Sequence, residues 1–371
     1  MRRALYVLTL VACSSASGPP AELRATGTSW TEADPLFRQN PRWLGADAAL
    51  SIDLGGDRIV WLFGDTFVAT SEAHVRSESE LVRNTVAVQS GRDPLRARLT
   101  FAWGTDPDTS PASFFPERGD RWHWPGHGAV IDNHLVVFLG ILRATPGEGL
   151  GFAGDGWRMA VIDDPTRPPS DWRPRYVDPP PQPAGVTGLV VGSAVVRVGE
   201  HLVALAIGPG STHRGHLVRW PAQALGQGDL AGAEWWSDRG WITAAALGSD
   251  TPAVVLDDAG AECSIHHDVA RGRWVHIASR GFGASTIALR TAPALEGPWS
   301  APTDVFTPPE SRGPRPFVYA AKAHPEITAP DGDLVVTYAT NSFTFGDLFT
   351  PAGRDALYWP RFVRLGITSG P

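Results

Sequence analysis

Two aspartates, Asp47 and Asp65, lie in one apolar segment with the sequence GADAALSIDLGGDRIVWLFGDTF. Each interrupts a run of residues that is typical of a buried β-strand. A carboxylate at the end of a core strand costs free energy unless it is paired or faces a wet cavity. The pair therefore predicts a polar site in the middle of a β protein. Two carboxyl groups, one protonated and one ionised, are also what the hydrolysis of a glycosidic bond requires.

Other titratable side chains interrupt apolar runs later in the chain. Glu262 is a third candidate catalytic carboxylate, and Glu326 is a candidate for catalysis or for binding sugar hydroxyls. His127, His266 and His324 are suited to orient a carboxylate or to bind sugar hydroxyls. We expect these side chains to converge on one cavity.

Trp124 and Asn341 complete the set of candidate substrate-binding residues. Trp124 offers a flat ring against which a sugar can stack, although tryptophan is more often a core residue. Asn341 lies in the segment DLVVTYATNS. The sequence has no CxxC, no HExxH and no clustered metal-ligand spacing, so we expect neither a metal nor a cofactor.

Most of these residues have a structural alternative. Asp65 follows a glycine and could bond nearby backbone N–H groups in a turn; Asp47 is less turn-like, because an apolar strand follows it at once. Glu262 could be a strand-start residue paired with an arginine. His266 and His267 are adjacent on a predicted strand and must point to opposite faces, so one of them is structural.

The composition favours an all-β architecture. The 371 residues include 40 Gly, 33 Pro and 15 Trp, which indicates many turns and many aromatic side chains. No long segment has a convincing helical period. The net charge is −7 and the basic residues are scattered, unlike the basic surface of a nucleic-acid-binding protein.

A weak repeat organises the chain. Each unit opens with a strand interrupted by polar or small residues and ends in a segment rich in Trp or Pro. Five openings predict five units of roughly 65 residues, which suits the four-stranded blades of a β-propeller; periodicity alone also allows a β-sandwich or a two-domain β protein. We expect residues 358–365 to form a last strand that pairs with an N-terminal element and closes the ring. The predicted openings are Ala46–Ile52, His127–Ile131, Val190–Val196, Glu262–Asp268 and His324–Thr328.

The N-terminus has the pattern of an exported lipoprotein. Arg2 and Arg3 precede a short apolar run, and Cys13 follows it as in a lipobox, although an ordinary cleaved signal is the alternative. We therefore expect a signal peptide over residues 1–12, a flexible tether over 13–30 and a single five-bladed β-propeller domain over 31–371. If Cys13 is lipidated, Cys263 has no partner, and a small buried hydrophobe is the favoured interpretation over a catalytic thiol.

Several segments together resemble a bacterial propeller family long catalogued as a domain of unknown function. They include WLFGDTF, NTVAVQSG, WHWPGHG, ECSIHHD and YAAKAHPEI, and the resemblance extends from about Trp43 to Leu365. Some members of that family are endo-D-arabinanases, glycoside hydrolases that cut the D-arabinan of mycobacterial cell envelopes. The resemblance implies a five-bladed propeller with its active site in the central funnel and with Asp47 and Asp65 as the leading catalytic residues. Looser similarity to other five-bladed glycosidases implies Glu262 as the proton donor.

Two kinds of function therefore compete. The first is an exported, membrane-anchored, monomeric glycoside hydrolase that acts on a polysaccharide such as D-arabinan. The second is a non-catalytic propeller that binds glycan or protein at the cell surface. A phosphate- or sulfate-ester hydrolase is disfavoured, because it would usually need a cluster of metal ligands.

Overall fold

The computed structural model describes residues 23–147, 151–210, 212–281, 283, 285–313 and 315–369. The expected signal peptide, Cys13 and the first part of the expected tether lie outside these residues. The rest of the tether prediction is wrong, because Leu23–Ser29 forms strand β1. This strand pairs along its whole length with β26 (Arg361–Ser369), so its backbone groups are satisfied in a sheet. In the described part of the chain, no helix is long and apolar enough to span a bilayer.

The fold is all-β, as expected, and five of its sheets have four or five strands among the described residues. The first contains β3 (Leu50–Gly55), β4 (Arg58–Phe63), β7 (Thr85–Ser90) and β8 (Arg98–Ala102). The second contains β11 (Arg121–Ile131), β12 (His134–Ala144), β13 (Phe152–Ile162) and β14 (Arg175–Val177). The third contains β15 (Val190–Val198), β16 (His201–Ile207), β17 (Gly215–Pro221), β18 (Glu234–Ser237) and β19 (Gly240–Thr243). The fourth contains β20 (Cys263–Asp268), β21 (Arg273–Arg280), β22 (Thr286–Ala292) and β23 (Thr303–Phe306). The fifth contains β24 (Pro316–Ala323), β25 (Leu334–Ser342), β26 and β1.

Smaller elements decorate these sheets. Two further sheets contain β2 (Trp43–Ala46), β5 (Thr66–Ala69) and β6 (Ser79–Val82), and β9 (Gly104–Thr105) and β10 (Pro111–Ala112). The α-helices are α1 (Ala222–Gly226), α2 (Ala244–Leu247) and α3 (Pro351–Ala356). The 3-10 helices are η1 (Asp34–Arg38), η2 (Arg76–Glu78), η3 (Pro169–Asp171), η4 (Ala184–Val186), η5 (Pro309–Arg312), η6 (Pro330–Gly332) and η7 (Phe345–Phe349).

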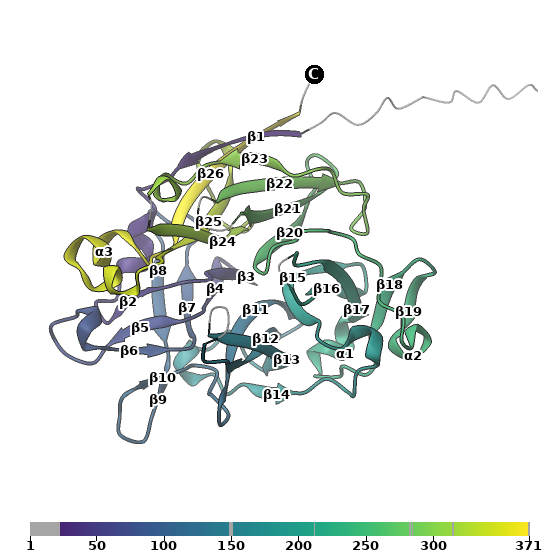
Figure 1. The fold of residues 1–371 in the computed structure, drawn as a ribbon, viewed down its shortest axis with the longest axis horizontal. Coiled ribbons are helices and arrows are strands. Elements are labelled where there is room, and N and C mark those ends of the chain that lie inside the picture. The colour runs from purple at the N-terminus through teal and green to yellow at the C-terminus, as the bar shows by residue number, and fades with distance from the viewer. Residues whose placement is uncertain are drawn as a thin grey trace, which may run out of the picture.

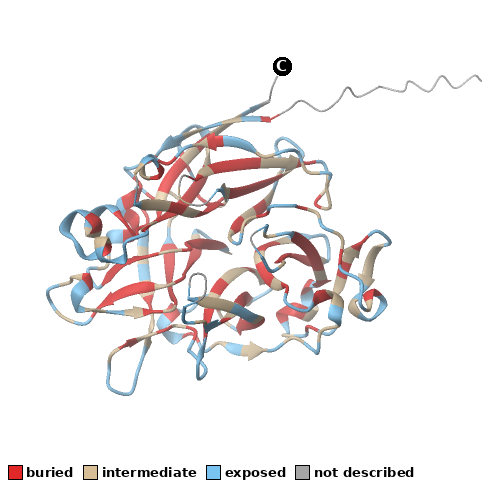
Figure 2. Ribbon diagram, in the orientation of Figure 1, coloured by how far each residue is buried: buried red, intermediate tan, exposed pale blue. Residues whose placement is uncertain are grey.

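Apolar side chains bury both faces of the middle strands (Figure 2). On β12, Leu135 and Val137 pack in one cluster with residues of the first sheet, whereas Val136 and Phe138 pack in another with residues of the third sheet. Neighbouring residues of a strand point to opposite faces. A strand that lies between two other sheets therefore needs a continuous apolar run, and this explains the segment from 135 to 139.

The innermost strands β3, β11, β15, β20 and β24 face a common centre (Figure 1). Side-chain hydrogen bonds fix the relative direction of two of them: Tyr319 of β24 bonds Asp47, which precedes β3, and His324, which follows β24, bonds Ser51 of β3. Both strands therefore run in the same direction along the central axis. The fifth predicted opening is wrong, because the inner strand is Pro316–Ala323 and His324 follows its end.

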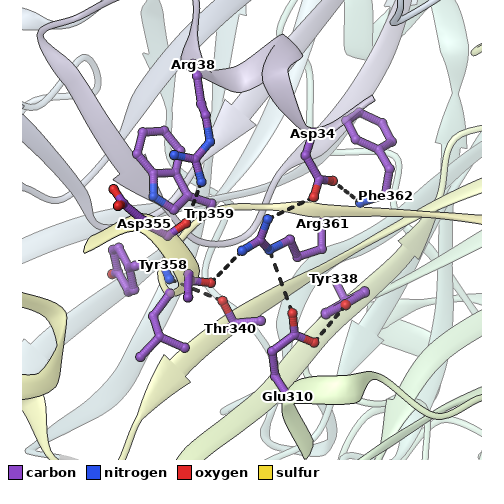
Figure 3. Close-up of polar contacts among 12 residues, drawn as sticks. Asp34, Arg38, Glu310, Tyr338, Thr340, Asp355, Tyr358, Trp359, Arg361 and Phe362 are labelled. Carbon is purple, nitrogen blue, oxygen red and sulfur yellow. Dashed lines mark hydrogen bonds and ion pairs between the residues drawn. The ribbon is translucent and has the colours of Figure 1, made fainter. Parts of the chain in front are cut away.

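The two ends of the chain are joined in the fifth sheet, as predicted. A polar network reinforces the junction between η1 and β26 (Figure 3). Asp34 accepts hydrogen bonds from the Arg361 guanidinium at 2.8 Å and from the Phe362 N–H at 3.0 Å. Glu310 lies 3.8 Å from the same guanidinium and accepts a hydrogen bond from the Tyr338 hydroxyl. These contacts tie the first helical turn of the described chain to its last strand.

Candidate active site

Asp47 lies in the loop between β2 and β3, where the chain enters the first inner strand. The Tyr319 hydroxyl donates to its Oδ2 at 2.8 Å, and its backbone oxygen accepts from the N–H groups of Ala49 and Gly64. A β-carbon at Gly64 would lie only 2.3 Å from Asp47 Oδ1, so only glycine fits there without a shift. The carboxyl group is thus held from two sides while it remains partly accessible.

The backbone around Asp47 is strained. Ala48, Ala49, Ala320 and Tyr358 all have positive φ, between 55° and 66°, which non-glycine residues seldom adopt. Such residues cost roughly 1–3 kcal/mol each and persist where the surrounding structure over-determines them. Lys322 supplies part of that restraint, because its Nζ donates to the backbone oxygens of Ala48 at 2.6 Å and Ala320 at 2.8 Å.

Asp65 lies between β4 and β5, and both of its oxygens contact side chains from other elements. Trp124 Nε1 of β11 donates to Oδ1 at 2.9 Å, and Arg83 Nη1 lies 3.4 Å from Oδ2. Arg83 also lies over the ring of Trp122, 4.4 Å from its centroid, and near Glu117. These contacts favour a role in the site over the interpretation of Asp65 as a turn cap.

Glu262 directly precedes inner strand β20, and its predicted alternative partner, an arginine, is instead a lysine. Lys322 Nζ lies 3.1 Å from Glu262 Oε1, with the Lys322 side chain 2% exposed and the Glu262 side chain 33% exposed. The next residue, Cys263, is buried. Burial raises its pKa to about 12, which fits the small buried hydrophobe rather than a reactive thiol.

The three carboxyl groups interact electrostatically. Burial raises the pKa of Asp47 well above its ordinary value, and the charges of Asp65 and Glu262 raise it further. Burial also raises the pKa of Asp65, but the hydrogen bond from Trp124 and the charge of Arg83 oppose this rise. Of the two aspartates, Asp47 therefore retains its proton more strongly.

The other predicted residues lie at a different depth along the axis. The Ser51 hydroxyl bonds Glu326 Oε1 and lies 2.5 Å from His324 Nδ1. Ser51 lies four residues beyond Asp47, in the strand that leads away from it. At about 3.3 Å per residue this places the two residues roughly 10 Å apart. The expectation that all the polar side chains converge on one cavity is therefore wrong: they form two groups at different depths.

His127 and His324 are bound as structural side chains. His127 Nδ1 accepts from the Val195 N–H, so its Nε2 carries the proton that it donates to the Ser51 backbone oxygen at 3.0 Å. Burial lowers the pKa of His127 to about 4. His324 is 1% exposed and its Nε2 bonds the Thr337 hydroxyl. Both rings thus link inner strands across the axis, and neither contacts the three carboxyl groups.

Beyond these histidines, a cavity of about 340 Å³ is lined by the far halves of the inner strands. His266 lies here, and burial lowers its pKa to about 4. Glu326 lines the same cavity, and burial raises its pKa. His267 is exposed, with its ring 5.0 Å from that of Trp274. The structure therefore places His266 and Glu326 away from the carboxyl groups with which the sequence grouped them.

Trp124 and Asn341 lie at the same end of the channel as Asp47. Trp124 orients Asp65 and packs edge-on against Phe152 at 4.6 Å. Asn341 ends β25 opposite Phe317, and its Oδ1 accepts from the N–H of Ser342. We use "acidic mouth" for this end of the channel, defined by Asp47, Asp65 and Glu262.

Three residues of the acidic mouth were missed in the sequence. Tyr319 and Lys322 lie within the quoted segment YAAKAHPEI, and Arg83 directly precedes NTVAVQSG. The one available signal was Lys322, a lysine between small apolar residues on a predicted strand, which is expected to need a buried partner. Nothing local distinguishes Tyr319 or Arg83 from core or surface residues.

This fold and site define a class: an all-β protein of propeller type with acidic residues at one end of its central channel. The chain belongs to the family described as "Domain of unknown function (DUF5005)", whose model matches residues 31–366. The resemblance to a family of that description is confirmed. No curated protein matches the chain in sequence.

Solved structures share the fold at low sequence identity. A protein from Bacteroides ovatus ATCC 8483, described as a "putative hydrolase", is 17% identical, with 95% of this chain and 97% of that chain covered and a TM-score of 0.71. An exo-β-1,3-galactanase from Phanerochaete chrysosporium is 13% identical, with coverages of 92% and 64% and a TM-score of 0.49. The α-L-arabinofuranosidase PaAbf62A from Podospora anserina is 10% identical, with coverages of 88% and 92% and a TM-score of 0.47.

Proposed function

We propose that the protein is a glycoside hydrolase with a five-bladed propeller fold, each of the five larger sheets forming one blade. The observation that carries this proposal is the pair Asp47 and Asp65. Both are partly accessible at the acidic mouth, and the pKa of Asp47 is raised further than that of Asp65. Such a pair supplies one protonated and one ionised carboxyl group at the same pH.

The environments of the carboxyl groups suggest a role for each. Asp47, which retains its proton, donates it to the oxygen of the leaving sugar. Asp65, whose carboxylate is stabilised by Arg83 and Trp124, acts as the general base that takes a proton from the attacking water. Glu262 is paired with Lys322, which favours its ionised form. We therefore propose that Glu262 raises the proton affinity of Asp47, rather than donating the proton itself as the family resemblance implied.

The proposed substrate is a cell-wall polysaccharide, with D-arabinan as the first candidate and internal cleavage as the mode. This choice rests on the resemblance to endo-D-arabinanases, because the chemistry of the acids does not discriminate among sugars. Arg2, Arg3 and Cys13 support a location at the bacterial cell envelope through an N-terminal lipid anchor.

The proposal is tested with Asp47→Asn and Asp65→Asn. Each variant and the native protein are incubated with D-arabinan, L-arabinan and xylan, and new reducing ends are measured. We expect native activity on at least one polymer and a loss of about 100-fold or more in each variant, the scale of a missing general acid or base.

Asp53→Asn is the matched control, because Asp53 lies on the same strand but away from the acidic mouth and pairs with Arg92. Its activity should stay within about twofold of the native protein, as for a surface pair of little energetic weight. Full activity in both Asp47→Asn and Asp65→Asn would refute the assigned roles. Retention of a polysaccharide without any cleavage would favour the non-catalytic binding protein.

A further inference from the structure

Five phenylalanines, which we call the Phe ledge, lie beside the acidic mouth: Phe67, Phe317, Phe343, Phe345 and Phe349. We propose that the ledge binds the saccharide chain of the substrate next to the bond that is cleaved, so that the protein selects a polymer over a short oligosaccharide. This inference rests on the proposed function and adds a binding site to it.

Exposure sets the ledge apart from the core. Phe343, Phe345 and Phe349 are 56%, 54% and 39% exposed, whereas Phe37 and Phe63 are fully buried. Large apolar side chains grouped on a surface cost solvation free energy, and such patches commonly mark binding sites. The three exposed rings all lie within residues 343–349, directly after β25.

The segment that carries these rings is fixed in place rather than loosely attached. Leu348 is fully buried, and its backbone oxygen accepts from the Arg76 guanidinium at 3.1 Å. Asp347 accepts from the Ser342 hydroxyl at 2.7 Å and lies 3.2 Å from Arg315. The rings are therefore presented to solvent by an ordered turn, as in a preorganised binding surface.

A continuous series of ring contacts joins the ledge to Asp47. The Tyr319 hydroxyl binds Asp47, and the Tyr319 ring lies 5.4 Å from that of Phe317. The Phe317 ring in turn lies 4.7 Å from that of Phe343. This line runs from the proposed acid outward to an exposed ring.

A second line of rings starts beside the same carboxyl group. Burial and the charge of Asp47 raise the pKa of Tyr358, and the Tyr358 ring lies 5.4 Å from that of Phe67. Phe67 lies 6.3 Å from Phe345 and 5.7 Å from Phe349. Two sugar residues cannot occupy the space beside Asp47 at once, so the rest of a bound chain must lie on an adjoining surface. The ledge adjoins it directly and offers flat apolar faces of the kind that pack against sugar rings.

The test uses Phe345→Ala, with Phe345→Tyr as the variant that keeps the ring and Leu95→Ala as the control. Leu95 is 49% exposed and lies in the loop between β7 and β8. For each protein, kcat/KM is measured on a polymer and on an oligosaccharide of the same linkage that is too short to reach the ledge. We expect Phe345→Ala to lower the polymer-to-oligosaccharide ratio about tenfold, equivalent to one aromatic contact, and the other two variants to preserve it.

Binding is measured separately, so that failure of the proposed function can be recognised. Asp47→Asn is combined with each variant, and retardation is recorded in gels that contain the polymer and on phosphatidylglycerol vesicles. Retardation by the polymer that Phe345→Ala weakens supports the ledge even if the native protein cleaves nothing, in which case the proposed function alone fails. An unchanged ratio with unchanged retardation overturns the ledge. Vesicle binding that Phe345→Ala abolishes, with no effect on the polymer, assigns the patch to membranes and also overturns it.

Discussion

Asp47 combines two opposing features. Its carboxyl group is buried enough to favour the neutral form, yet it accepts a hydrogen bond from Tyr319 and remains partly accessible. A general acid needs this combination, because it must hold a proton at the working pH and still reach the substrate. The strained alanines that follow it show that the fold spends conformational energy at this point.

Asp47→Asn should stabilise the protein at neutral pH while it removes activity. Above about pH 4 the unfolded chain loses the Asp47 proton and the folded chain keeps it, so the free energy of unfolding falls until pH passes the raised pKa. Asparagine cannot ionise and avoids this loss. Urea unfolding should therefore show a larger advantage of the variant at about pH 8 than at about pH 5. An asparagine variant that is less stable than the native protein at both values would contradict the raised pKa.

At this scale, the sequence located the acids but not their partners. Asp47, Asp65 and Glu262 were recognisable because each is an acid at the edge of an apolar run. Tyr319 and Lys322 come from a strand far along the chain, and only the ring of sheets brings them to the site. Sequence order alone does not say which distant strand becomes the neighbour.

The inner strands act as the elements that set depth. Position along each strand decides whether a side chain reaches the acidic mouth or the cavity behind it, as Glu262 and His266 on or beside β20 illustrate. The predicted openings were right about most strands. They were wrong about depth, because a list of polar residues in inner strands carries no common starting level.

The junction of β1 with β26 should determine stability. Removal of residues 1–29 would leave the backbone of β26 unpaired at an exposed edge, which promotes loss of stability and association between chains. We expect a chain that begins at Trp30 to unfold at a lower temperature and to aggregate, whereas a chain that begins at Leu23 should match the full-length protein. Thermal unfolding and light scattering provide the measurement. Equal behaviour of the two truncated proteins would show that the junction is dispensable.

The whole molecule should unfold as one unit, as expected for a single domain over residues 31–371. Each sheet buries its faces against its neighbours, as β12 does between the first and third sheets. Loss of one sheet therefore exposes the core of the next. Tryptophan fluorescence, which draws on 15 residues spread along the chain, and far-ultraviolet circular dichroism should give coincident urea transitions. Two separated transitions would indicate independent domains.

Ser51, His127 and His324 link three different inner strands across the axis, between the acidic mouth and the cavity. This crossing has a consequence for traffic through the molecule. A sugar released beside Asp47 would have no passage to the opposite side and would have to depart through the opening by which the substrate arrived. On the proposed function, departing fragments and incoming chain would then compete for one doorway, and the pace of turnover would depend on how quickly the doorway clears.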